Sequence, residues 1–253
     1  MISVGRLSVA PVKGLALQHP DSIELTDHGV RDDRRFFFID DGNRVVDGLL
    51  AGPLVKVGAW ADSDGSCLRI TLPDGEVVQA DVTPSEQVEI AMYSRRVVGH
   101  LIDGPWAEAL SPLAGRNVRL VRTDEPGGTR THHHASLVSD GSLGRLGDQL
   151  GVGAVDGRRF RMLIELTGGA DHEEDTWIGS RVAVGETVML ISGPIPRCAI
   201  TTHDPDSGER DLDTLRAILE YRGLRDGKDL DFGVYGEVER PGRVAVGDEL
   251  TVL

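Results

Sequence analysis

The sequence predicts a β-rich α+β fold, and three features of the residue pattern lead to this prediction. Short runs of alternating apolar and polar residues recur along the chain, which is the pattern of half-buried strands. Asp-Gly turns separate neighbouring runs at 40–43 and 73–76, and such turns favour antiparallel hairpins. Helical periodicity is confined to a few short segments. Strands and helices therefore do not alternate as in a doubly wound parallel sheet, and a barrel fits the pattern better.

The strands and helices are predicted from apolar periodicity and turn residues. In the first half, strands are expected at 7–12, 22–26, 35–40, 54–61, 68–72, 77–82, 88–91 and 117–121, and a helix at 105–113. In the second half, helices are expected at 142–150 and 211–221, and strands at 160–166, 187–192, 197–202, 232–238 and 249–253. The helix at 211–221 has the clearest pattern, with leucines at helical spacing and Gly223 just past its end.

A segment rich in Gly, Pro and polar residues at 123–136 suggests a loop between two halves. We therefore expect one domain over 1–125 and a second over 126–253, packed so closely that the two are interwoven. The length of 253 residues is enough for this arrangement. The tract His132–His134 inside this loop is interpreted as solvated, because adjacent side chains cannot all point toward one metal.

Composition excludes several classes of function. The net charge of -14 argues against nucleic acid as a partner. No apolar run reaches the roughly 18 residues of a membrane helix, and the N-terminus alternates like a strand instead of resembling a signal peptide, so a cytoplasmic protein without a membrane partner is expected. Two cysteines provide neither a disulfide framework nor an iron–sulfur cluster. The charged run Glu173–Asp175 is interpreted as solvated surface.

Cys198 is the residue with the strongest chemical character. Two prolines make its approach rigid, and Arg197 places a cation beside the thiol. A neighbouring cation favours the thiolate, which is the form that attacks, transfers sulfur or binds a soft metal. A buried structural cysteine needs no such neighbours, and the residues alone leave both interpretations open. Cys67 is expected to be a buried small hydrophobic residue.

The segment around Cys198, PRCAITTHDPDSGERD, resembles the signature of the MOSC domain, in which an Arg-Cys pair precedes a Thr-Thr-x-Asp-Pro run. Residues 5–47 resemble the MOSC N-terminal β-barrel domain, with Pro-Val-Lys followed by Asp-Arg before an aromatic strand. Further landmarks follow in the right order at 159–161, 174–177, 232–235, 241–242 and 247–248. The resemblance covers nearly the whole chain. It implies a MOSC-type β-barrel packed with a β-barrel-like N-terminal domain and a few helices.

Proteins with both parts are similar to the mitochondrial amidoxime-reducing component and to bacterial hydroxylaminopurine reductases. The resemblance implies that Cys198 is the catalytic residue and ligates molybdenum, and that Lys13, Arg34, Arg161 and Arg197 contact the phosphate or pterin of a molybdenum cofactor. Forked guanidinium donors suit such an anion. The implied activity is reduction of N-hydroxylated small molecules, such as amidoximes and hydroxylamines, with electrons from a separate ferredoxin or flavoprotein reductase.

Three of these cations also have a structural alternative: Lys13 as a surface lysine, Arg34 as a partner of Asp32 or Asp33, and Arg161 as part of an ion pair at a strand edge. Other functions for Cys198 stay open as well. One is a sulfur carrier or cofactor-delivery protein with a persulfide on Cys198, supplied by another protein because no pyridoxal-phosphate portion is present. Another is a cofactor binder without activity.

Departures from the family pattern surround the expected site. Gly14 replaces the usual Ser after Pro-Val-Lys, Leu163 replaces an Asn, and residues 46–50 lack the usual Thr-x-Arg. Glu165 is also an unexpected anion near an anionic cofactor. These departures affect the choice of substrate more than the binding of a cofactor.

Overall fold

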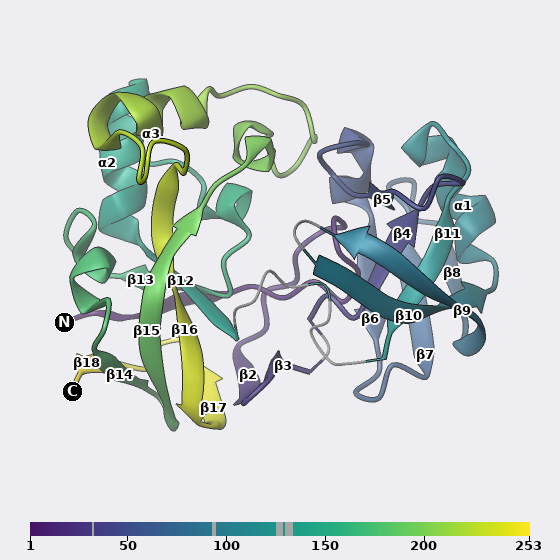
Figure 1. Cartoon of the computed structure of the whole chain (residues 1–253), viewed down its shortest axis with the longest axis horizontal. Helices are drawn as coiled ribbons and strands as arrows, with labels where there is room; N and C mark the ends of the chain where they lie inside the picture. Colours follow the sequence, from purple (N-terminus) through teal and green to yellow (C-terminus); the bar gives the residue numbers. More distant parts are fainter. Residues whose placement is uncertain (32, 93–94, 125–128, 130–133) are drawn as a thin grey trace.

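The computed structural model describes residues 1–253 except 32, 93–94, 125–128 and 130–133. Two lobes built mainly from strands lie side by side, with helices α2 and α3 in one lobe and α1 in the other (Figure 1). The predicted β-rich α+β class is confirmed. In the described part of the chain, no helix is long and apolar enough to cross a bilayer. His132 and His133 lie outside the described residues.

One lobe is a seven-stranded sheet that curls into a nearly closed barrel. Its strands in spatial order are β1 (Ser3–Leu7), β13 (Ile164–Thr167), β12 (Ala135–Ser139), β16 (Asp231–Arg240), β15 (Thr187–Pro196), β14 (Arg181–Val184) and β18 (Leu250–Val252). The two edges approach each other, because Ser3 bridges to Glu249 and the Val4 amide donates to the Asp248 carbonyl at 2.9 Å. Val4, Val182 and Val234 are among the buried residues of its interior. This near closure leaves few edge groups unpaired.

The other lobe combines two smaller sheets. The five-stranded sheet contains, in spatial order, β5 (Val45–Val46), β4 (Phe36–Ile39), β11 (Arg119–Thr123), β10 (Arg95–Asp103) and β9 (Thr83–Met92). The three-stranded sheet contains β6 (Gly58–Ala61), β7 (Cys67–Thr71) and β8 (Val77–Asp81). Helix α1 (Trp106–Ala114) buries Trp106, whose indole N–H donates to the Leu68 carbonyl at 3.2 Å. Phe36 and Phe38 complete this second core.

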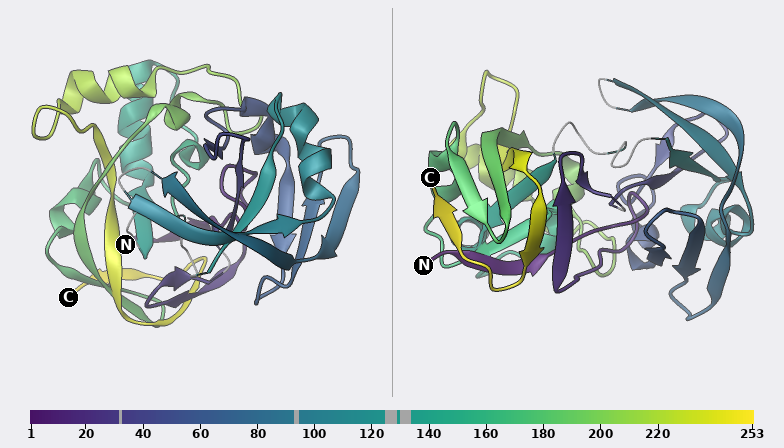
Figure 2. Two further views of the ribbon diagram at one scale, coloured as in Figure 1. Left: turned by 45° about the vertical axis from the view of Figure 1, so that its right-hand side comes forward. Right: turned by 90° about the horizontal axis from the view of Figure 1, so that it is seen from below.

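The start of the chain belongs to the lobe that also contains its end. After β1, strand β2 (Ser22–Thr26) pairs with both β3 (Gly29–Val30) and β17 (Gly242–Ala245). The chain then enters the other lobe at β4 and returns to the barrel at β12 (Figure 2). The segment between β1 and β4, which carries Lys13 and Arg34, therefore passes between the two lobes.

Both predicted hairpins form. Residues 40–43 connect β4 to β5, and residues 73–76 connect β7 to β8, each in an antiparallel pair. The helices α2 (Asp140–Leu150) and α3 (Thr214–Arg222) also lie close to their predicted positions. Their caps are Ser139 and Asp213, whose side chains accept from the backbone amides three residues on, as N-cap residues do.

The prediction of a strand over 197–202 is wrong. Strand β15 ends at Pro196, and Ala199–Thr202 forms a 3-10 turn, η4. The hydroxyls of Thr201 and Thr202 donate to the Cys198 and Ala199 carbonyls at 3.2 and 2.7 Å. Such local bonds give the backbone an alternative to sheet pairing. Cys198 therefore lies where the strand ends and the turn begins.

Several other predicted strands begin or end elsewhere. Residues 54–56 belong to a 3-10 turn, η1 (Gly52–Lys56), which has Pro53 in its first turn. Residues 160–163 precede β13, since the turn η2 (Gly157–Phe160) occupies the first of them. Strand β1 lies earlier than the predicted 7–12.

The interpretation of Glu173–Asp175 as solvated surface is wrong for Glu174. This residue lies in the turn η3 (Glu173–Trp177) and is 0% exposed. Its carboxylate accepts hydrogen bonds from the Ser139 and Ser142 hydroxyls, both at 2.6 Å. Burial raises the pKa of Glu174, and the two hydroxyls oppose this rise. The charge run thus contains a buried contact that fastens η3 to the start of α2.

A buried arginine joins η2 to the segment that follows η4. Arg159 is 6% exposed and makes a two-fold contact with Asp211, with both Nη–Oδ distances at 2.6 Å. Asp204, from the Thr-Thr-x-Asp-Pro run, lies 3.6 Å from the same guanidinium. The signature residues after Cys198 thus hold its turn against the neighbouring segment.

Replacing Asp211 with Ala is expected to lower the free energy of unfolding by about 1–3 kcal/mol, because a buried guanidinium loses its main partner. Urea denaturation measures this change. Asp206→Ala is the matched control, since Asp206 pairs with Arg158 while its side chain is 69% exposed, and a loss below about 1 kcal/mol is expected there. Equal losses in the two variants would contradict the role assigned to Arg159.

Candidate functional site

A cavity of about 540 Å³ lies between the two lobes and contains all five residues singled out in the sequence. Lys13 and Arg34 come from the segment between β1 and β4, Arg161 follows η2, and Arg197 and Cys198 follow β15. Residues that are far apart in the chain thus gather four cationic side chains and one thiol around a single space.

Arg34 is held in place by a buried carboxylate. Its Nη1 donates to Asp33 Oδ2 at 2.6 Å, and its Nη2 donates to the Arg161 carbonyl at 2.8 Å. Asp33 is 0% exposed, and its Oδ1 accepts from the Ala10 amide at 2.7 Å. The predicted pairing with Asp33 therefore exists, while Asp32 lies outside the described residues. This pairing directs the guanidinium into the cavity wall.

Arg34 and Arg161 share an unusual backbone conformation. Their φ angles are 55° and 52°, in the left-handed region that favours glycine. A non-glycine residue held there costs on the order of 1–3 kcal/mol, and such strain clusters at binding sites. Arg161 is further fixed by a hydrogen bond from its Nη2 to the Leu15 carbonyl at 2.7 Å. Both arginines are thus positioned by strained backbone and by contacts with main-chain groups.

Lys13 lies inside this cluster of positive charge instead of on the surface. The pKa of its ammonium group is lowered to about 8, mainly by burial and also by the nearby Arg34 and Arg161, while Asp47 and Cys198 act in the opposite direction. The folded protein therefore holds the charged lysine at an energetic cost. A bound anion would relieve this cost.

Arg197 has a different environment from the other cations. Its Nε donates to the Phe232 carbonyl at 2.7 Å and its Nη1 to the Phe160 carbonyl at 3.2 Å, and the guanidinium lies 5.3 Å from the Phe160 ring centroid. Burial lowers the pKa of Arg197, and the adjacent Cys198 opposes the lowering. The guanidinium keeps its charge at neutral pH. Arg197 thus links the end of β15 to β16 and η2 directly beside the thiol.

Cys198 is exposed, whereas the neighbouring Arg197 is partly buried. Its backbone is extended, and its carbonyl accepts from the amide and hydroxyl of Thr201. Thr201 is buried and hydrogen-bonded to Thr214 of α3 at 2.8 Å. The thiol therefore projects from a well-anchored turn, where a ligand in the cavity can reach it. Cys67 is only partly buried.

The departures from the expected pattern have structural explanations. Gly14 has a φ of 85°, and a Cβ atom there would lie 2.6 Å from Asp47 Cβ. The serine usually present at this position therefore does not fit beside the turn that contains Asp47. Leu163 is buried, but its amide donates to the Ser136 hydroxyl at 2.9 Å. Ser136 thus places a polar atom near the position of the missing Asn.

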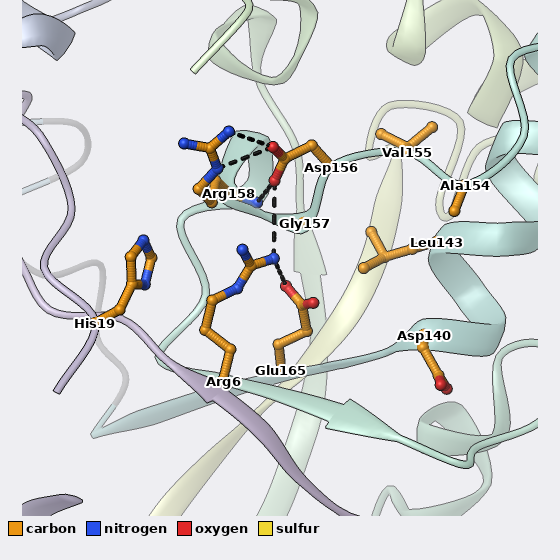
Figure 3. A pocket seen from close by; sticks show the side chains of 10 residues that line it. All are labelled: Arg6, His19, Asp140, Leu143, Ala154, Val155, Asp156, Gly157, Arg158 and Glu165. Atoms are coloured by element: carbon orange, nitrogen blue, oxygen red, sulfur yellow. Dashed lines mark hydrogen bonds and ion pairs between the residues drawn. The ribbon is translucent and has the colours of Figure 1, made fainter. Parts of the chain in front are cut away.

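Glu165 does not line the cavity of Cys198. It faces a separate cavity of about 470 Å³ (Figure 3), where it accepts from Arg6 at 2.6 Å. Asp156 in the same cavity pairs with Arg158 at 2.6 Å. The Glu165 carboxylate therefore lies outside the cavity that Cys198 lines.

Sequence reasoning missed two carboxylates of the main cavity as functional candidates, Asp33 and Asp47. Asp33 was considered only as a partner of Arg34, although it also accepts the Ala10 amide. The sequence did contain an indication for Asp33, because a carboxylate next to Arg34 in the chain can position that guanidinium. The sequence of the 46–50 turn signalled only that a usual motif is absent there, and nothing in it indicated that the turn meets Gly14.

A sequence model of the MOSC domain matches residues 124–251. Human mitochondrial amidoxime-reducing component 1 is 31% identical, in an alignment that covers 99% of this chain and 83% of that protein. The chain belongs to the MOSC domain family. The resemblance noted in the sequence is therefore confirmed.

Other relatives are similar over almost all of this MOSC protein. Mitochondrial amidoxime reducing component 2 of Bos taurus is 26% identical, covering 97% of this chain and 82% of that protein. Molybdenum cofactor sulfurase of Drosophila grimshawi is also 26% identical, but the 98% of this chain that aligns corresponds to 34% of that protein. A crystal structure of the YuaD protein from Bacillus subtilis has a TM-score of 0.47 at 14% identity, with 99% of this chain and 94% of that chain covered.

Replacing Lys13 with Met is expected to stabilise the fold at pH 7. The pKa of Lys13 falls from 10.5 to about 8 on folding, so its cost is fully present below pH 8 and disappears as the pH rises toward 10.5. The variant is expected to gain about 1–3 kcal/mol at pH 7 and to lose the rise of stability with pH across this window. Denaturant titrations at several pH values measure both effects. Lys56→Met is the control, because Lys56 is exposed. A Lys13→Met variant that is less stable than the wild type at pH 7 would contradict the energetic cost assigned to charged Lys13.

Replacing Gly14 with Ser is expected to destabilise the protein by more than its backbone strain alone. Gly75→Ser is the matched control, because Gly75 has a φ of 90° with nothing within 4 Å of a Cβ atom, whereas Gly14 meets Asp47. Gly75→Ser measures the cost of the left-handed backbone, about 1 kcal/mol. Gly14→Ser should cost about 1–3 kcal/mol more, measured by urea denaturation. Equal losses of stability in Gly14→Ser and Gly75→Ser would show that the turn containing Asp47 moves away from a new side chain without cost.

Proposed function

We propose that this MOSC protein binds a molybdenum cofactor and reduces N-hydroxylated small molecules with electrons from a separate donor. The observation that carries the proposal is the meeting of Lys13, Arg34, Arg161 and Cys198 at one cavity. Relatives named amidoxime-reducing components cover almost the whole chain and support the class of reaction.

The residues of the cavity suit a cofactor that has an anionic phosphate and a metal that binds thiolate sulfur. Localised cations are needed to hold a phosphate, and in a protein of net charge -14 they are concentrated here by a buried carboxylate and by main-chain contacts. Burial and the neighbouring Arg34 and Arg161 lower the pKa of Lys13, which shows how closely these cations lie together. A phosphate-bearing group suits such a cluster of cations, and an exposed thiol is a suitable soft ligand.

In this proposal Cys198 is the protein ligand of the metal, and Arg34, Arg161 and Lys13 bind the phosphate or pterin. When bound, the cofactor supplies the two-electron chemistry at an N–OH group. Arg197 keeps its donors on the Phe160 and Phe232 carbonyls and orients the segment that carries the thiol. A contact between Arg197 and the cofactor remains part of the proposal, because this side chain also lines the cavity.

The remaining parts of the proposal concern partners and organisation. Electrons would come from a ferredoxin or flavoprotein reductase, since the two cysteines are too few for an iron–sulfur cluster. We also propose a cytoplasmic location and two interwoven domains over 1–125 and 126–253, in which β1 and β2 of the first pair with β13 and β17 of the second. In this division the cavity is lined by residues of both domains.

A second candidate function is a sulfur carrier with a persulfide on Cys198. The exposure of the thiol favours it, as does the similarity to a molybdenum cofactor sulfurase over 98% of this chain. The two functions differ in what Cys198 carries. A persulfide adds one sulfur atom to the protein mass and is removed by reductant, whereas a cofactor adds molybdenum and a pterin.

The deciding experiment measures molybdenum per chain by elemental analysis and pterin by fluorescence after oxidation, in protein made in a host that synthesises the cofactor. Wild type is expected to contain nearly one molybdenum and one pterin per chain. Cys198→Ala should lose most of the metal, because its soft ligand is gone. Cys67→Ala is the matched control and should remain loaded.

Loaded wild-type protein is then tested for reduction of an amidoxime and a hydroxylamine with a chemical electron donor. Absence of metal and pterin from the wild type, while a known molybdoenzyme from the same host is filled, would refute the reductase. A reductant-sensitive mass increase of one sulfur on Cys198 would then support the carrier. A loaded protein that reduces neither compound would support a binder without activity.

A further inference from the structure

We propose that Asp47 selects substrates by charge, so that the cavity prefers N-hydroxylated compounds that carry a positive charge on a flat apolar group. The proposal rests on the proposed function and names the substrate class of the same cavity. Asp47 becomes a specificity-determining residue, and Leu49, two residues further on, contacts the apolar group of the substrate.

Asp47 lies in a compact turn at the cavity wall. Its Oδ1 accepts from the Leu49 amide at 3.1 Å, and its carbonyl accepts from the Leu50 and Ala51 amides at 3.0 and 2.9 Å. Asp47, Gly48 and Leu49 all line the cavity. The carboxylate is therefore fixed by its own turn and does not depend on a distant ion pair for its position.

This turn packs directly against both sides of the candidate site. A Cβ atom on Gly48 would lie 3.5 Å from Ile200 Cδ1, two residues beyond Cys198, and 2.8 Å from Val55 Cγ1. On the other side, Asp47 occupies the space next to Gly14, which follows Lys13. The absence of a side chain at both glycines lets the turn approach the thiol-bearing segment. The departures at Gly14 and at 46–50 are thus one structural feature.

The charges in the cavity give Asp47 a role distinct from that of Asp33. These two are the carboxylates among the described lining residues, and Asp33 is buried against Arg34 and the Ala10 amide. Asp47 instead raises the pKa of Lys13, against the effect of the arginines. When the cations hold an anionic cofactor, Lys13 acquires a second counter-charge. The carboxylate of Asp47 is then available to a cation in the substrate.

Apolar side chains line part of the cavity, and Leu49 is one of them. Leu49 and Leu50 are 45% and 44% exposed, which is unusual for leucines beside a polar site. Further apolar side chains of the cavity come from the barrel lobe, among them Phe160, Met162, Leu163, Ile195 and Ile200. The apolar part of a substrate in the cavity can therefore contact Leu49 while its polar group faces Asp47.

A planar group with two parallel N–H donors suits this arrangement. Amidinium and guanidinium groups present such a fork, and a carboxylate accepts it in two hydrogen bonds. A neutral amide of the same shape lacks the charge, and a carboxylate is repelled by Asp47. Discrimination thus includes a repulsive element as well as an attractive one.

The test measures binding with benzamidinium, benzamide and benzoate, which share one flat ring and differ in charge. Isothermal titration calorimetry is performed on protein from the cofactor-synthesising host, for wild type, Asp47→Asn and Asp74→Asn. Asp74 is the matched control, since its Oδ1 also accepts the amide two residues on, at 3.0 Å, but in the exposed 73–76 turn. Asparagine preserves that turn contact at both positions.

Wild type and Asp74→Asn are expected to bind benzamidinium about 10- to 100-fold more tightly than benzamide, with benzoate weakest. Asp47→Asn should lose this preference and bind benzamide as the wild type does, which separates lost charge from lost structure. A wild type that binds the three compounds equally, or binds none of them, would overturn the proposal, as would an unchanged preference in Asp47→Asn. Molybdenum and pterin are assayed on the same samples. An empty protein refutes the proposed function and this proposal with it, whereas loaded protein that lacks the preference refutes the role of Asp47 alone.

Discussion

The buried carboxylate of Asp33 is the group on which the candidate site depends. It accepts the Ala10 amide through one oxygen and Arg34 through the other, and Arg34 in turn donates to the Arg161 carbonyl. One side chain thus connects the segment leading to Lys13, the Arg34 turn and the opposite lobe. A charged pair at such depth is favourable only when its hydrogen bonds are satisfied. The main chain satisfies them here and also fixes where the cations point.

The energetics of the cavity favour binding over stability. Two arginines have left-handed backbones, a lysine is charged among them, and each of these features costs free energy in the unliganded fold. The barrel and the aromatic core of the other lobe supply the stability that permits this. Such a distribution is typical of sites that are organised before their ligand arrives, because the ligand then has less reorganisation to drive.

The sequence predicted the fold class, both Asp-Gly hairpins and the residues gathered at the cavity, since these depend on local periodicity and on a family signature. It did not predict the turn at Ala199–Thr202, because the apolar run resembles a strand while the threonine hydroxyls favour a turn. The buried state of Glu174 was missed for a similar reason, as its partners Ser139 and Ser142 lie over 30 residues earlier. The contact between Gly14 and Asp47 depends on tertiary packing, which no local pattern encodes.

The pairing of β1 with β13 has a consequence for the life of the chain on the ribosome. The first strand of the barrel finds its neighbour only after residue 167 has been made, and the sheet closes against residues 249 and 250. Contacts of such long range form late. Until residue 201 has been made, the early segment with Lys13 and Arg34 lacks part of its opposite wall. The binding cavity thus forms only after the residues of both lobes that line it have been synthesised, and a ligand that needs both walls binds after that point.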